Sequence, residues 1–64
     1  MEPVELTRLA GTCTRGDCPT VYRTDRGTLA VQGNHLSGNE SPAGEAIVEI
    51  PDWLLLEAAR ALGG

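Results

Sequence analysis

Residues 20–32 carry the clearest strand pattern in the chain, two apolar runs separated by a short polar segment. The run TVYRT is β-branched and aromatic, the triplet DRG follows it, and TLAVQ then continues the chain. An Asp with a Gly two positions later is typical of a type I turn whose glycine is left-handed and forms a G1 bulge. The pattern therefore predicts a β-hairpin over residues 20–32, with Gly27 as the bulge and Val21 facing Val31.

The chain after the hairpin changes from a loop pattern to a strand pattern. Residues 33–45 are rich in Gly, Asn, Ser and Pro, which predicts a flexible loop. Residues 46–50 (AIVEI) are mostly apolar and partly β-branched, and they predict a third strand. Residues 1–12 fit either a short strand or one helical turn, and their pattern does not separate the two.

The run PDWLLLEAARAL predicts a helix over residues 51–62 that stops at the two final glycines. Pro51 suits the first helical position because its missing N–H needs no partner there, and Asp52 complements the helix dipole. At 100° per residue, one broad apolar arc collects the side chains expected to cover a sheet. These are Leu54, Leu55, Ala58, Ala59 and Leu62.

Together these elements predict one small α+β domain over residues 1–64. Its sheet has three antiparallel strands, or four if the N-terminus adds one, and the C-terminal helix packs on it. A domain of this length buries only ~60% of the surface that its unfolded chain exposes, so its stability is marginal without a disulfide, a metal ion or a partner.

Composition and charge narrow the function. Nine acidic residues against five Arg give a formal charge of −4, which disfavours direct nucleic-acid binding and favours a basic protein partner. The N-terminus lacks the basic flank and apolar run of a signal peptide. The longest apolar run, WLLL, is too short to span a bilayer. We therefore expect a cytoplasmic protein with no membrane contact.

The two cysteines leave three interpretations open. Cys13 and Cys18 bracket an Arg-Gly-Asp triplet, but an adhesion role for that triplet needs export, which nothing in the sequence supports. The cysteines fit two packed thiols, or a disulfide that closes a short loop and stabilises the fold by on the order of 2 kcal/mol. With His35, the only histidine, they fit a weak zinc site that is one ligand short.

No arrangement of residues predicts catalysis. His35 lies in a Gly/Asn/Ser-rich segment without a nucleophile beside it, and a catalytic pocket is hard to build in so small a domain. We predict a protein that is not an enzyme and that has no cofactor.

Trp53 has two interpretations, because with Leu56 it lies beside Glu57 and Arg60, which mark the side of the helix opposite the predicted apolar arc. In the first, Trp53 folds over a sheet edge and belongs to the core. In the second, Trp53, Leu56 and Tyr22 form an exposed apolar patch that binds a partner, as exposed aromatic residues do at interfaces.

The order of motifs resembles the small actinobacterial proteins related to the developmental regulator BldB. Those proteins run Cys-x-x-Val at the first strand, then a hairpin, then a strand that leads into Thr-Pro-x-x-Trp and a terminal helix. Here the segment CPTV at residues 18–21 matches the first motif and IPDW at residues 50–53 the second. The resemblance covers residues 17–62, although Pro51 and Trp53 are one residue closer together and the aromatic-rich N-terminal segment is missing.

The resemblance implies a small partner of helix-turn-helix transcription regulators that tends to self-associate. The leading hypothesis is therefore an acidic interaction module that acts as an anti-regulator, or in the manner of an antitoxin. The rivals are a zinc module built on Cys13, Cys18 and His35, and a homo-oligomer, such as a homodimer, whose shared interface completes the core.

Overall fold

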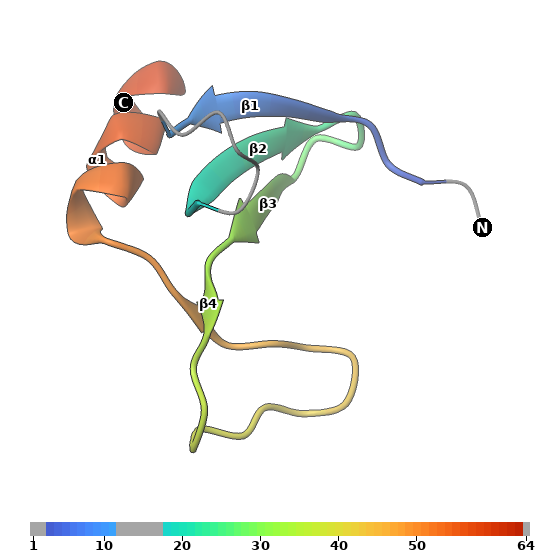
Figure 1. Cartoon of the computed structure of the whole chain (residues 1–64). Helices are drawn as coiled ribbons and strands as arrows, with labels where there is room; N and C mark the ends of the chain where they lie inside the picture. The colour runs from blue at the N-terminus through green and yellow to red at the C-terminus, as the bar shows by residue number, and fades with distance from the viewer. Residues whose placement is uncertain (1–2, 12–17, 64) are drawn as a thin grey trace.

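A computed structural model describes residues 3–11 and 18–63 of the chain (Figure 1). Within those residues the structure has five strands and one C-terminal helix, so it is an α+β fold, as the sequence predicts. The elements in chain order are β1 (Leu6–Ala10), β2 (Thr20–Thr24), β3 (Leu29–Gln32), β4 (Asn34–His35), β5 (Val48–Glu49) and α1 (Asp52–Ala61).

The main sheet has three antiparallel strands in the order β1-β2-β3. Its hairpin confirms the predicted register, because Val21 pairs with Val31 and Tyr22 with Ala30. Gly27 has φ +77°, the left-handed conformation that the turn requires. The strand that completes this sheet is β1, which lies in the segment whose pattern left strand and helical turn open.

The predicted third strand over residues 46–50 takes a different place. Only residues 48–49 form a strand, β5, and it pairs with β4 in a separate two-stranded sheet. β4 lies inside the segment predicted as a loop. Gly33 makes this arrangement possible because a Cβ at that position would lie 2.5 Å from the carbonyl oxygen of Glu49. Such a contact is closer than side chains tolerate, so only glycine lets the two backbones approach there.

Helix α1 begins one residue later than predicted. Pro51 is its N-cap, with φ −67° and ψ 148°, and Asp52 is the first helical residue. At the other end the N–H of Gly63 donates to the carbonyl of Arg60 at 3.0 Å, and Gly63 itself has φ +88°. The chain therefore ends the helix with a left-handed glycine, as helices commonly do.

The core lies between α1 and the β1–β2 side of the main sheet. The buried hydrophobic residues, each at most 2% exposed, are Ala10, Val21, Leu54 and Ala58, and Leu9 and Ile50 pack against them. α1 lies beside the end of β1 and the start of β2 (Figure 1). The predicted apolar arc of the helix was therefore too wide. Leu55, Ala59 and Leu62 are exposed, because a helix resting on two strands buries only a narrow stripe.

A hydrogen bond fixes the rotation of the helix on the sheet. The N–H of Gly11, just after β1, donates to Oε2 of the half-buried Glu57 at 2.8 Å. Gly11 has φ +117°, which only glycine adopts readily. A hydrogen bond to a charged acceptor contributes about 1.5–3 kcal/mol, so this contact holds the Glu57 side of α1 toward β1.

Replacing Leu54 with Ala should lower the free energy of unfolding by about 2–5 kcal/mol, because it opens a cavity at a fully buried position. That loss is a large part of the total free energy of unfolding, because native domains have only ~0.05–0.15 kcal/mol of stability per residue. Leu56→Ala is the matched control on the same helix and should change stability by at most about 0.5 kcal/mol. Chemical denaturation checks both variants, and equal losses would contradict the packing described above.

Candidate interaction surface

Helix α1 exposes most of its large apolar side chains. Leu55 is 62% exposed, Leu56 60% and Trp53 49%. Only Leu54 and Ala58 of this helix are buried. A helix covered on one side should carry polar residues on the other, so an apolar outer side needs an explanation.

The exposed apolar residues of α1 form a connected surface because of their spacing. Leu55 and Ala59 are four residues apart and Trp53 and Leu56 are three apart, so each pair lies together on the helix surface. We call Trp53, Leu55, Leu56 and Ala59 the outer face of α1. The buried residues Leu54 and Ala58 point instead to the sheet. Apolar residues thus occupy most of the circumference, and Glu57 and Arg60 lie beside Trp53.

Charges border the outer face at both ends of the helix. Asp52 stands in the first turn and Arg60 in the last, and both side chains are exposed. The other exposed acidic residues in the described part of the chain are Glu5, Asp25, Glu40, Glu45 and Glu49. With the net charge of −4, the outer face is an apolar patch on an acidic molecule.

The structure brings together only part of the predicted patch. Trp53 and Leu56 lie on the same helix and are both exposed. Tyr22 is half-buried in β2, directly after Val21, whose side chain faces α1. Successive strand residues point to opposite faces, so Tyr22 faces away from the helix. Leu55 belongs to the surface instead, and sequence reasoning missed it because its position fits the predicted core arc.

The cysteine and histidine positions do not converge in the described residues. Cys18 is disulfide-bonded, and its carbonyl accepts hydrogen bonds from Thr20 Oγ1 and Gln32 Nε2, both at 2.9 Å. Cys13 lies outside the described residues. His35 is exposed in β4, in the second sheet. Among the described side chains no group of three His, Cys, Asp or Glu is placed to hold a metal ion.

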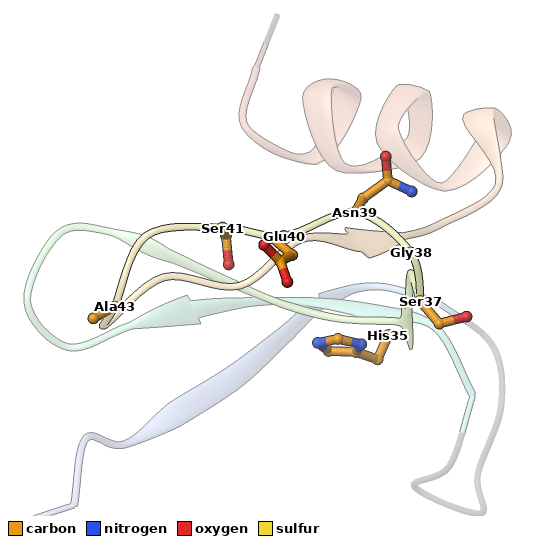
Figure 2. Close-up of a pocket in the computed structure, with 7 residues that line it drawn as sticks. All are labelled: His35, Ser37, Gly38, Asn39, Glu40, Ser41 and Ala43. Atoms are coloured by element: carbon orange, nitrogen blue, oxygen red, sulfur yellow. The ribbon is translucent and has the colours of Figure 1, made fainter.

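A hollow of about 980 Å³ lies along the loop that joins β4 to β5 (Figure 2). In Figure 2 the side chains of Glu40 and Ser41 point to the same side of the loop as the His35 ring, and Asn39 points away. The Ser41 hydroxyl donates to the carbonyl of Glu45 at 3.0 Å, which holds it on the loop. The hollow is open and its lining is about half polar, unlike the enclosed, mostly apolar pockets that bind small molecules. The outer face of α1 is therefore the stronger candidate.

Comparisons of the chain with protein-family models, curated proteins and solved structures found no match. The resemblance to BldB-related proteins thus stays a prediction. Within the described residues, no helix has the length and the apolar character that crossing a bilayer requires.

The exposure of Trp53 can be measured directly, because it is the only tryptophan in the sequence. We expect red-shifted indole emission in the native protein and acrylamide quenching that approaches the quenching of a free tryptophan analogue. The same protein in denaturant gives the reference for full exposure. Blue-shifted emission with weak quenching would instead place the indole in the core.

Proposed function

We propose that this chain is a protein-interaction module that binds a helix-turn-helix DNA-binding regulator through the outer face of α1. The observation that carries the proposal is the position of Trp53, Leu55 and Leu56, which are about half to two-thirds exposed on a ten-residue helix. Contiguous apolar surface with an aromatic residue is what protein interfaces use as an anchor.

The charge of the chain supports a basic partner of this class. A DNA-binding regulator carries a surface rich in Lys and Arg that contacts phosphates. A chain with a net charge of −4 attracts such a surface and repels DNA. Binding there would compete with DNA, which is the action of an anti-regulator or of an antitoxin-like protein in the cytoplasm.

The energy available on the outer face sets a limit on affinity. Full burial of a large apolar side chain is worth about 1.5–3 kcal/mol. Because Trp53, Leu55 and Leu56 are partly covered already, a partner that covers the remainder gains on the order of 3–4 kcal/mol. Association itself costs at least ~4 kcal/mol. The outer face therefore anchors a complex, and charge or additional apolar contact must supply the rest.

Binding to a regulator should weaken when the anchor is removed. The helix-turn-helix regulators of the source organism would be screened as purified proteins by isothermal titration calorimetry against the full chain. For a regulator that binds, we expect Trp53→Ala and Leu56→Ala each to raise Kd about tenfold, equivalent to about 1.4 kcal/mol, without changing the far-ultraviolet circular dichroism spectrum.

The control for this experiment is Leu6→Ala. Leu6 is 50% exposed. It pairs with Thr24 of β2 and lies on the face of the sheet that carries Tyr22, away from α1. Its replacement should therefore leave Kd within about twofold. The proposal fails if no regulator of this class binds, or if Leu6→Ala weakens binding as much as Leu56→Ala. It also fails if the outer face only joins two copies of this chain, which sedimentation over a range of concentrations would show.

A further inference from the structure

The main sheet has apolar side chains that α1 leaves uncovered. Val31 pairs with Val21 across the hairpin, and directly paired residues point to the same face of a sheet. Leu29, two residues before Val31, shares that face. Val21 is buried under α1, but Leu29 and Val31 are each 46% exposed. The apolar face of the sheet is thus covered over β2 and open over β3.

The rotation of α1 about its axis determines which side of the helix lies nearest β3. The Glu57 side of α1 is held toward β1 by the hydrogen bond from Gly11. On the other flank, Leu62 lines a hollow of about 240 Å³ together with Leu29 and Arg23. Leu55 is seven residues before Leu62, so the two lie within about 20° of each other around the helix axis. Leu55 and Leu62 therefore border the uncovered part of the sheet.

The uncovered surface over β3, beside α1, is wide enough for a second helix. Neighbouring strands are ~4.8 Å apart and packed helices are ~8–10 Å apart. α1 rests on β1 and β2, so a helix one packing distance away lies over β3 and its open edge. We call the strip formed by Leu29, Val31, Leu55 and Leu62 the α1–β3 groove.

We propose that the α1–β3 groove binds an amphipathic helix of the partner protein, laid antiparallel to α1. The partner's identity as a regulator depends on the function proposed above, whereas the groove and its preferred occupant depend on the residues named here. The occupant would supply the additional apolar contact that the outer face of α1 needs.

The charges at the two ends of the groove select the direction of that helix. Arg23 lines the hollow at the hairpin end, where α1 finishes. At the opposite end the backbone of Glu49 lies against Gly33, just after β3, and Asp52 begins α1. Helices commonly carry acidic residues in the first turn and basic residues in the last. An antiparallel helix of this kind places its acidic start at Arg23 and its basic end at Glu49 and Asp52.

A second copy of the chain is the alternative occupant, because α1 itself has Asp52 in its first turn and Arg60 in its last. However, each copy carries a net charge of −4, and two like-charged molecules repel each other. A basic partner gains from the same charge. The groove therefore favours a helix from a different protein.

The test uses the full chain and two labelled synthetic peptides of about four helical turns, ~14 residues each. Both peptides have the same leucine stripe; one has acidic residues in the first turn and basic residues in the last, and the other has glutamine at all of those positions. By fluorescence anisotropy we expect the acid-first peptide to bind about tenfold more tightly, equivalent to about 1.4 kcal/mol. Arg23→Glu should abolish or reverse that preference.

Substitutions in the groove identify the binding site. Leu29→Ala and Leu62→Ala should each weaken the acid-first peptide about tenfold, and Leu6→Ala, equally exposed on the other face, should change it less than about twofold. Circular dichroism and thermal unfolding show whether each variant stays folded. Should Leu29→Ala unfold the chain, perturbation of the backbone amide resonances of residues 29–31 and 62 in the wild-type protein locates the peptide instead.

Several results would overturn the proposal. The binding experiment would do so if neither peptide bound saturably or if both bound with equal affinity. The resonance experiment would do so if the perturbed amide resonances were confined to Trp53 and Leu56. Sedimentation would do so if it showed that a second copy already fills the groove. The outcome is separable from that of the proposed function. Peptide binding in the groove without any binding regulator would uphold the groove alone. A regulator sensitive to Trp53→Ala but not to Leu29→Ala or Arg23→Glu would uphold the function alone.

Discussion

The packing of Leu54 and Ala58 on Val21 and Ala10 is the interaction on which the rest of the structure depends. It provides nearly all of the fully buried apolar contact in the described residues. The hydrogen bond from Gly11 to Glu57 fixes the angle at which this contact forms. Once that angle is set, the 3.6-residue period decides which other helix residues point to solvent. The apolar outer face of α1 is therefore a consequence of a narrow core.

The narrow core also supports the proposal that a second polypeptide covers part of this chain. The sequence has no Phe, and its only aromatic residues are Trp53 and Tyr22. Tyr22 faces away from α1, so aliphatic side chains fill the space between helix and sheet. The one large aromatic side chain that could widen the core, Trp53, is half exposed instead. Small domains gain stability from disulfides or partners when their cores are small, and this chain has a disulfide-bonded Cys18 and uncovered apolar surface on both α1 and β3.

Local sequence patterns were sufficient to predict the hairpin and the helix. The turn around Gly27 is set by residues next to it, so its register follows from the sequence. The prediction that residues 46–50 join the main sheet was wrong. Pairing between distant strands depends on the backbone approach at Gly33, which no periodicity of the sequence reveals. The membership of β1 in the sheet is a long-range property of the same kind.

The candidate site was only partly predictable for a related reason. Helical spacing groups Trp53 with Leu56, but it does not say how far the core reaches around the helix. That limit comes from the position of α1 over two strands, which exposes Leu55 and Leu62. Strand alternation separates Tyr22 from Val21, but it does not say which of the two faces the helix covers. Tertiary packing decides that α1 covers the face of Val21.

The most direct measurement is the set of methyl nuclear Overhauser contacts in the isotopically labelled chain without a partner. One-sided packing predicts contacts from the Leu54 methyl groups to Val21 and Ala10, and none from Leu56 to the main sheet. Strong contacts from Leu55 or Leu56 to Val21, with Leu54 turned to solvent, would mean that the helix is rotated. In that case neither the outer face of α1 nor the groove beside it exists as described.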